Sequence, residues 1–405
     1  MSGALQTYKN VHPHHIPYRE YRFLFVILAV VKNTKTYYIA LGSNLGDRYV
    51  NLQQAVDYCF SNLGSIDKLS RIYECEAKGF EGPAFYNACI SLRSKFSPKE
   101  VMTKLLLFEQ KLGRERHFEG YKSRTIDLDI ILSDEDIIES DDLQVPHSKM
   151  HLRDFVLQPL ADIAPDLNHP TLKVPITELL STVTNGSGLD LVSLWLKNPA
   201  AQYAMPDGQF LAIEGNIGAG KTSLANLISD EFNAHLVLER FSENPFLPKF
   251  YKNPKRYAFS LEMSFLAERY HQINEDLSQL DLFSRFVVSD YFIFKSLIFS
   301  KVTLSEDEFA LYRKLFDILN KDTPKPDMYV YLHQSIDRLK ENIDKRGRDY
   351  ESSIEVDYLK RINDSYLEYL RTQQNFPVKI IDLSSVDFVE NRHDYIKILK
   401  EISTV

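Results

Sequence analysis

The sequence has few cysteines, no apolar run long enough for a membrane span, and a deficit of positive charge. The three cysteines are an odd number without CxxC or Cys/His spacing, which argues against a disulfide framework and a zinc site. The net charge of −8 excludes broad contact with nucleic acid, because such contact needs many Lys and Arg side chains. We therefore expect a cytoplasmic protein that binds neither membranes nor nucleic acid.

The start of the chain contains an apolar run, residues 23–31, that lacks the features of a signal peptide. The run is too short to span a bilayer. A polar and basic segment follows it where a signal peptide needs a small-residue cleavage site. We interpret residues 1–35 as an N-terminal extension.

Length and composition indicate two folded domains. A chain of 405 residues exceeds the size at which a single core stops growing, about 250–300 residues. Residues 184–207 are rich in Gly, Ser, Pro and Ala and lose most of their periodicity, which predicts a linker. It would separate a domain over 36–183 from a domain over 208–405.

Apolar periodicity in the first domain predicts four strands, over 37–41, 71–75, 86–93 and 126–132, and two helices, over 49–63 and 98–112. The first helix carries one apolar stripe, and a capping box at Ser97–Glu100 starts the second. This order is the α+β ferredoxin-like arrangement, in which two helices cover one face of an antiparallel sheet. The other face would be free for ligands.

The second domain alternates strands with long helices. The predicted strands lie at 210–213, 236–238, 286–289, 328–332 and 378–381. Such alternation is typical of an α/β protein with an open parallel sheet.

Two aspartates mark a candidate metal site in the first domain. Asp127 and Asp129 are two residues apart in an apolar strand, so their side chains project from the same face. A carboxylate pair suits one or two Mg²⁺ ions that bridge ATP phosphates. The alternative from the pattern alone is ordinary solvated strand charge.

Five segments around this pair form a recognisable set. They are Ala40–Gly46, Phe85–Ala88, Gly113–Arg116, Arg124–Asp129 and Val145–His147. In this order, over about residues 37–180, the chain resembles the 6-hydroxymethyl-7,8-dihydropterin pyrophosphokinases (2-amino-4-hydroxy-6-hydroxymethyldihydropteridine diphosphokinases). The resemblance implies a ferredoxin-like fold and transfer of pyrophosphate from ATP to the hydroxymethyl oxygen of the pterin, with release of AMP, in folate biosynthesis.

The same resemblance implies roles for individual residues. Two Mg²⁺ ions would bind Asp127 and Asp129. The ATP phosphates would be met by Arg114, Arg116, Arg124 and His147. The pterin would stack between Phe85 and Phe155 and bond to Asn87. One departure concerns the pterin loop, where Cys75 stands in place of a common Thr.

The second domain contains a phosphate-binding loop. Residues 215–222 fit GxxxxGK[ST], directly after a predicted strand and at the start of a helix, which is the context that the motif requires. Gly215, Gly218 and Gly220 would let backbone N–H groups surround phosphate oxygens. Lys221 would reach the β- and γ-phosphates, and the Thr222 hydroxyl would bind Mg²⁺.

Further segments extend the pattern. Residues 345–348 hold three cations in four residues, which is typical of a solvated helix end but also of a lid over a transferring phosphate. With Glu239–Phe246, Phe259–Glu262 and Ser289–Asp290, over about 208–370, the chain resembles deoxynucleoside kinases. The resemblance implies ATP-dependent phosphorylation of a deoxynucleoside 5′-hydroxyl in nucleotide salvage. We expect a homodimer formed through this domain.

That resemblance again implies residue roles. Glu239 would accept the hydroxyl proton, and Asp290 would support Mg²⁺. The transferred phosphoryl group would be stabilised by Arg346 and Arg348. The nucleoside would be bound by Tyr251, Glu262, Arg269 and Glu351, with Tyr251 and Glu351 on its 3′-hydroxyl.

Two positions depart from this family. Glu262 stands where a base-reading Gln is usual, and Tyr291 stands where an Asp/Glu-Arg-Ser motif has its Arg. Because a carboxylate only accepts hydrogen bonds, Glu262 favours bases that carry an amino group. Two alternatives stay open for the second domain. It could be a kinase for a nucleoside monophosphate or another small acceptor, or a silent module for nucleotide binding and dimerisation.

Overall fold

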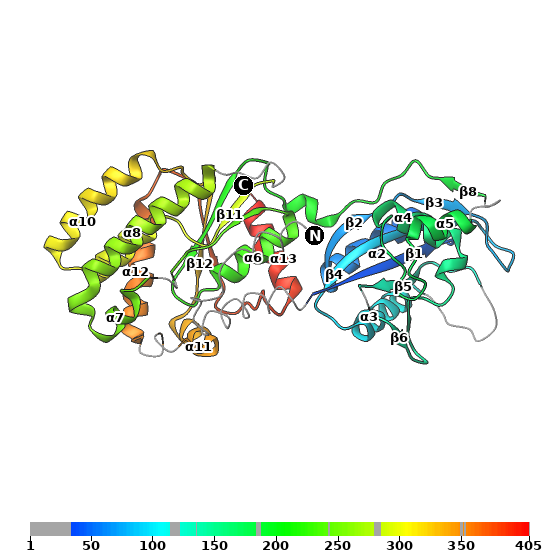
Figure 1. Cartoon of the computed structure of the whole chain (residues 1–405), viewed down its shortest axis with the longest axis horizontal. Helices are drawn as coiled ribbons and strands as arrows, with labels where there is room; N and C mark the ends of the chain where they lie inside the picture. Colours follow the sequence, from blue (N-terminus) through cyan, green and yellow to red (C-terminus); the bar gives the residue numbers. More distant parts are fainter. Residues whose placement is uncertain are drawn as a thin grey trace. The chain divides into compact units, whose positions relative to one another are not determined.

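The structure is a computed structural model that describes residues 34–113, 122–134, 136–183, 188–241, 244–278, 285–348, 351 and 354–404. Most of the predicted N-terminal extension, 1–35, lies outside these residues. The chain forms two compact units, residues 1–198 and 199–405, which Figure 1 shows with their elements labelled. None of the helices described is both long and apolar enough to cross a membrane.

The first unit is built around an antiparallel sheet. Its strands are β1 (Lys35–Ser43), β2 (Gly64–Leu69), β3 (Tyr73–Cys75), β4 (Phe85–Ser94), β5 (Asp127–Ser133) and β8 (Leu189–Leu191), with a separate pair β6 (Ile138–Glu139) and β7 (Gln144–Val145). Its helices are α2 (Arg48–Asn62), α3 (Pro98–Lys111), α4 (Asp154–Ile163) and α5 (Ile176–Val183), with one 3-10 turn, η1 (Met150–Leu152). The sheet order is β5-β1-β4-β3-β8, and β2 also pairs with β4.

The predicted helices of this unit form for the expected reasons. In α2 the apolar stripe, which includes Leu52, Val56 and Phe60, is buried. At the start of α3, Ser97 accepts from the Glu100 N–H, and the Glu100 carboxylate accepts from the Ser97 N–H at 2.8 Å. Both the stripe and the capping box are confirmed.

The expectation that one face of the sheet stays free is wrong in part. Helices α4 and α5 pack on the face of the sheet that carries Tyr38 and Ala40, in a core with Ile131 and Leu157. The pattern did not reveal α4, because Pro159 lies inside it. These helices cover part of the face that was expected to stay free.

The segment predicted as a linker, 184–207, is partly packed structure. Strand β8 pairs antiparallel with β3, and the Asn198 side-chain amide donates to the Ile66 carbonyl at 2.8 Å. The division between the units falls between residues 198 and 199. Three-residue β8 was missed because its pairing partner lies more than a hundred residues away in the sequence.

The second unit has the predicted parallel sheet. Its strands are β9 (Phe210–Gly215), β10 (His235–Val237), β11 (Val287–Ser289), β12 (Met328–His333) and β13 (Val378–Asp382), in the order β10-β11-β9-β12-β13. All four pairings are parallel. The helices are α6 (Lys221–Phe232), α7 (Leu247–Lys252), α8 (Pro254–Ser278), α9 (Lys295–Thr303), α10 (Glu306–Leu319), α11 (Ile336–Arg346), α12 (Val356–Thr372) and α13 (Arg392–Ser403), with 3-10 turns η2 (Pro199–Tyr203) and η3 (Asn320–Asp322).

The central strand of this sheet, β9, indicates where a ligand site would lie. Every residue of β9 is buried, and the strand lies between β11 and β12. In open parallel sheets, ligands bind beyond the carboxyl ends of the strands. Strand β9 ends at Gly215 and β11 at Ser289, so the residues that follow them form the site.

Candidate active sites

The carboxylate pair of the first unit lies on the face of the sheet that carries Ala40 and Gly42. Asp127 pairs with Gly42 and Asp129 with Ala40 across β1, and directly opposed residues share a face. The Arg124 guanidinium donates to Asp127 Oδ2 at 2.7 Å. Both carboxylates are half-buried, and their oxygens are the ligand type that Mg²⁺ prefers.

Gly42 shows that the predicted pterin residues converge on this pair. A Cβ atom built on Gly42 would lie 3.6 Å from Asn87 Oδ1 and 3.7 Å from both Asp127 Cβ and Phe85 Cδ1. Three residues proposed for two ligands therefore surround one glycine on β1. The Asn87 amide donates to the Cys75 thiol at 3.2 Å, so the Cys at this position holds the amide in place.

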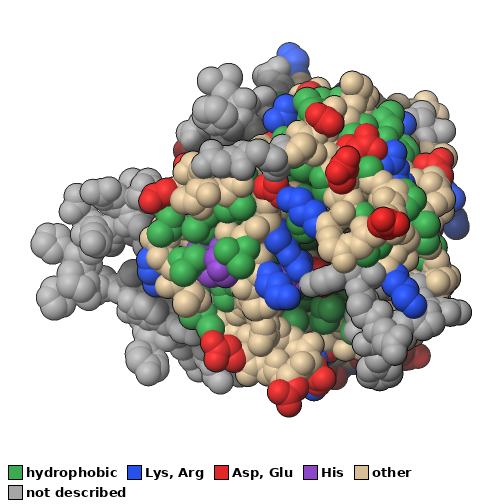
Figure 2. All heavy atoms as spheres, turned by 90° about the vertical axis from the view of Figure 1, so that its right-hand side faces the viewer, with side chains coloured by type: hydrophobic (Ala, Val, Ile, Leu, Met, Phe, Trp, Pro, Cys, Tyr) green, Lys and Arg blue, Asp and Glu red, His purple; other side chains and the backbone are tan. Residues whose placement is uncertain are grey.

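Of the remaining residues predicted for this site, the structure describes Phe155 and His147. Phe155, the second residue of α4, is half-buried, with the Lys78 amine 5.5 Å from the centroid of its ring. His147 accepts a hydrogen bond from the Lys149 N–H, and burial followed by the nearby Arg153 charge lowers the pKa of its imidazole. Arg114 and Arg116 lie outside the described residues. Figure 2 shows several Lys and Arg side chains close together near the middle of this face, with Asp and Glu side chains scattered around them.

Two positioning residues of this site were missed from the sequence. The Asn44 side chain, 2% exposed, accepts from the Arg124 N–H at 2.7 Å and donates to the Pro83 carbonyl at 3.1 Å. Glu109 of α3 accepts from the Leu128 N–H at 2.7 Å, between the two aspartates. The signal for Glu109 was a charged residue on the buried face of an amphipathic helix.

In the second unit, the phosphate loop has the backbone that its glycines predict. Gly218 and Gly220 have φ of 84° and 91°, a region that favours glycine. A Cβ on Gly218 would also lie 2.8 Å from the Leu339 carbonyl oxygen. The Lys221 ammonium donates to the carbonyls of Gly215 and Asn216 at 3.0 and 2.9 Å, so it curls back over the loop.

Buried charges surround this loop. Burial, and next the Lys295 charge, lower the pKa of Lys221 to about 8. The Thr222 hydroxyl donates to Asp290, and Asp290 Oδ1 accepts from the Glu239 N–H at 2.8 Å. Burial raises the pKa of Asp290. The hydroxyl and carboxylate side by side are an oxygen pair that suits Mg²⁺ beside a phosphate.

Glu239 lies at the centre of a cluster of charged side chains in the cavity. Arg269 donates to its Oε1 at 2.7 and 2.8 Å, and Lys295 donates to its Oε2 at 2.6 Å. Burial alone would raise the pKa of Glu239, but the Lys295 and Arg269 charges outweigh burial and hold it at about 2. Arg269, predicted as a nucleoside ligand, thus contacts the predicted base directly. Lys295 was not predicted.

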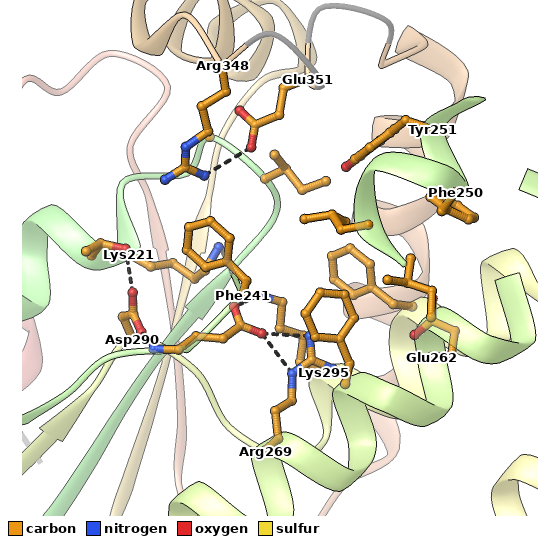
Figure 3. Close-up of a pocket in the computed structure, with 18 of the residues that line it drawn as sticks. Lys221, Phe241, Phe250, Tyr251, Glu262, Arg269, Asp290, Lys295, Arg348 and Glu351 are labelled. Atoms are coloured by element: carbon orange, nitrogen blue, oxygen red, sulfur yellow. Dashed lines mark hydrogen bonds and ion pairs between the residues drawn. The ribbon is translucent and has the colours of Figure 1, made fainter. Parts of the chain in front are cut away.

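The lid arginines are paired with a predicted sugar ligand. Arg346 donates to Glu351 Oε2 at 2.5 and 3.0 Å, and Arg348 donates to Oε1 at 3.1 Å. Arg348 also lies over the Phe241 ring, 4.4 Å from its centroid. Figure 3 shows Arg348 and Glu351 on one side of the pocket, facing Lys295 and Arg269 on the other.

The cavity has two chemically different ends. Lys221 and Asp290 lie at one end in Figure 3, while Phe250, Tyr251 and Glu262 lie at the other. The lining of the second end is mainly apolar and aromatic, and includes Leu247, Leu261, Phe265, Phe299 and Tyr358. Glu262 is buried there, and its Oε1 accepts from the Thr303 hydroxyl at 2.9 Å.

Comparisons with known proteins follow this division into two sites. The family model described as 7,8-dihydro-6-hydroxymethylpterin-pyrophosphokinase (HPPK) matches residues 38–165, and the model described as deoxynucleoside kinase matches 211–405. A 2-amino-4-hydroxy-6-hydroxymethyldihydropteridine pyrophosphokinase of Porphyromonas gingivalis is 42% identical over 34% of this chain and 96% of its own length. A deoxyguanosine kinase of Bacillus subtilis is 37% identical over 49% of this chain and 98% of its own length. The chain belongs to both families.

The deoxynucleoside kinase relatives differ among themselves in their named substrate. Besides the Bacillus deoxyguanosine kinase, a deoxyadenosine kinase of Lactobacillus acidophilus is 33% identical over 48% of this chain and 94% of its own length. Both names refer to purine nucleosides, and both purines carry an exocyclic amino group. Membership of the family therefore does not determine which base this chain favours.

The departure from the kinase motif at Tyr291 has a structural consequence. Tyr291 is fully buried in the core of the P-loop unit, with Phe292 and Tyr329. Its hydroxyl has no hydrogen-bond partner among the described residues. No charged side chain could occupy this place without losing its hydration, so the cation of the family motif has no equivalent at position 291.

Proposed function

We propose that the second unit phosphorylates the 5′-hydroxyl of a deoxynucleoside with ATP, and that the first transfers pyrophosphate from ATP to 6-hydroxymethyl-7,8-dihydropterin. The observation that carries the kinase assignment is the arrangement of the P-loop cavity. A phosphate-binding end and an aromatic end meet at the Glu239 carboxylate. A nucleoside with its flat base among aromatic rings would present its 5′-hydroxyl between Glu239 and the loop.

The chemistry needs little activation of that hydroxyl. Phosphoryl transfer proceeds through a loose transition state, so positioning and electrostatic stabilisation dominate catalysis. Glu239, held as an anion by Arg269 and Lys295, orients the hydroxyl by accepting its hydrogen bond. It takes the proton late, as the new P–O bond forms. Arg346 and Arg348 exchange Glu351 for the phosphate charge.

The alternative acceptor, a nucleoside monophosphate, is disfavoured by the charges that would surround its phosphate. Among the described lining residues, Arg269 and Lys295 bind Glu239, and both lid arginines bind Glu351. The aromatic end offers the carboxyl of Glu262 and no cation. The phosphate of a monophosphate acceptor would lie beside the Glu239 carboxylate, whose negative charge would repel it, whereas an uncharged nucleoside meets no such repulsion.

The first unit supports pyrophosphoryl transfer through convergence of its predicted ligands. Asp127, Asn87 and Phe85 surround Gly42, so a pterin held by the last two would have its hydroxymethyl group beside the carboxylate pair. Mg²⁺ held by Asp127 and Asp129 would neutralise the triphosphate. Arg124, paired with Asp127, can turn to the phosphates when metal takes that carboxylate.

Several broader expectations belong to the same proposal. The strand order supports a ferredoxin-like arrangement if β2 and β3, which both pair with β4, count as one interrupted strand. In the second unit, Thr222 and Asp290 would hold Mg²⁺ for ATP. A homodimer through this unit and a cytoplasmic location remain predictions from the sequence, and analytical ultracentrifugation of the full chain would test the dimer.

A panel of acceptors tests the proposed acceptor of the second unit. ADP release by the full chain would be measured with each deoxynucleoside and with each deoxynucleoside monophosphate. Turnover with deoxynucleosides alone supports the proposal. Turnover only with monophosphates would replace it, and no ADP with any acceptor would make the unit a silent nucleotide-binding module.

A further inference from the structure

Lys295 is the first residue of α9, four residues beyond Tyr291. In the family motif the cation comes directly after the acidic residue, here Asp290. That place holds Tyr291, which is fully buried and carries no positive charge. Lys295 supplies a cation to the cavity from the start of α9.

The side chain of Lys295 is built into the site. It is 10% exposed, and its ammonium donates to Glu239 Oε2 at 2.6 Å. Its amine also lies 5.5 Å from the centroid of the Phe299 ring, which belongs to the aromatic end of the cavity. The ammonium therefore stands at the meeting point of the two ends, where the 5′-hydroxyl and the γ-phosphate of ATP would meet.

Resting on the function proposed above, we propose that Lys295 is a catalytic residue of the kinase unit that takes over the role of the motif arginine. In the free enzyme it donates to Glu239. During transfer it donates to the attacking hydroxyl oxygen and to an oxygen of the transferred phosphoryl group. An ammonium can do this because its three N–H donors point in different directions.

The phosphoryl transfer needs no change in the charge of Lys295. The 5′-oxygen forms a bond to the γ-phosphorus, and the bond from that phosphorus to the β,γ-bridging oxygen breaks. ADP leaves with the electron pair of that bond. The hydroxyl proton passes to the Glu239 carboxylate. Lys295 stays an ammonium throughout and neutralises charge that shifts between the two oxygens.

Arg269 and Lys295 both contact Glu239, but their other contacts give them different roles. The Arg269 guanidinium is engaged twice by Glu239 and once by Ser296, at 2.8 Å. Those contacts fix it behind the carboxylate. The Lys295 ammonium donates one hydrogen bond among the described residues, to Glu239, which leaves two N–H donors for substrate oxygens. Arg269 thus positions the base, while Lys295 can reach the reacting atoms.

The test compares four variants in the full chain, with ADP release from the deoxynucleoside that wild type uses. K295M, which removes the ammonium at nearly constant length, is expected to lower kcat about 10²–10³-fold, the loss typical of one transition-state donor, with little change in KM for the nucleoside. K295R keeps the charge and is expected to stay within about tenfold of wild type. K301M on the same helix, where Lys301 pairs with exposed Glu368, is the matched control and keeps full activity.

Chemical rescue separates charge from packing. Propylamine, but not propanol, is expected to restore part of the kcat of K295A, since only the amine supplies an ammonium. AMP release by the first unit reports the amount of each variant, and the melting transition of the P-loop unit reports its folding. Wild type without any ADP release would instead remove the proposed function itself.

Three results would overturn the proposal for Lys295. They are a K295M kcat within about threefold of wild type, equal rescue of K295A by amine and alcohol, and failure of both K295M and K295R to give the melting transition of the P-loop unit. The last would make Lys295 a structural partner of Glu239 only.

Discussion

Replacing Glu262 with glutamine should stabilise the P-loop unit at alkaline pH and leave its stability nearly unchanged in acid. Glu262 is 2% exposed, and its Oε2 has no hydrogen-bond partner among the described residues. Burial raises the pKa of this carboxyl from 4.5 to about 7, although Arg269 and the Thr303 hydrogen bond act in the opposite direction. The folded protein therefore binds this proton more tightly than the unfolded chain does.

The sign and size of this change in stability with pH follow from proton linkage. The stabilisation is fully present below pH 4.5, where both states are protonated, and is lost as the pH rises through about 7. At 1.36 kcal/mol for each pKa unit, the loss amounts to about 3 kcal/mol in the free energy of unfolding. Glutamine at this position has no proton to lose, so the variant escapes this loss.

Scanning calorimetry of the full chain measures the effect. At about 2–4 °C for each kcal/mol in a unit of this size, E262Q should melt about 6–12 °C above wild type near pH 8.5 and close to it near pH 5. The transition of the pyrophosphokinase unit should not move. E268Q, on the same helix, serves as control. An equal difference between E262Q and wild type at both pH values would refute the reasoning.

Further predictions concern the two reactions. The preference of wild type for deoxyadenosine or deoxycytidine over thymidine should rise from about pH 6 to about pH 8.5, as Glu262 loses its donor proton, and should be flat in E262Q; product analysis with competing nucleosides checks this. E239Q should lower kcat for ADP release by about 10²–10⁴-fold, measured as initial rates, since the proton acceptor is lost. D127A and D129A should each abolish AMP release and leave ADP release unchanged, measured by chromatography of the nucleotides; AMP release retained in either variant would contradict the metal assignment.

Local patterns predicted the parts of the molecule that local sequence determines. The phosphate loop needs its glycines at fixed spacing between a buried strand and a helix, so residues 215–222 reveal both the fold around them and their role. The carboxylate pair was visible in the same way, because alternation in a strand places Asp127 and Asp129 on one face.

What sequence did not reveal depends on contacts between distant segments. Lys295 stands in an apolar run and shows its role only through Glu239, which is 56 positions away. Glu109 acts through Leu128, and β8 exists only because β3 offers it an edge. The sequence shows that Tyr291 replaces the motif Arg, but only the fold shows that its side chain lies in the core.

One chain carries two ATP-dependent transferases. The most direct test is chromatography of the nucleotides formed from ATP by the full chain with each acceptor alone and with both together. The account predicts AMP with hydroxymethyldihydropterin alone, ADP with a deoxynucleoside alone, and both products with the mixture. Formation of only one of the two products under all three conditions would contradict it.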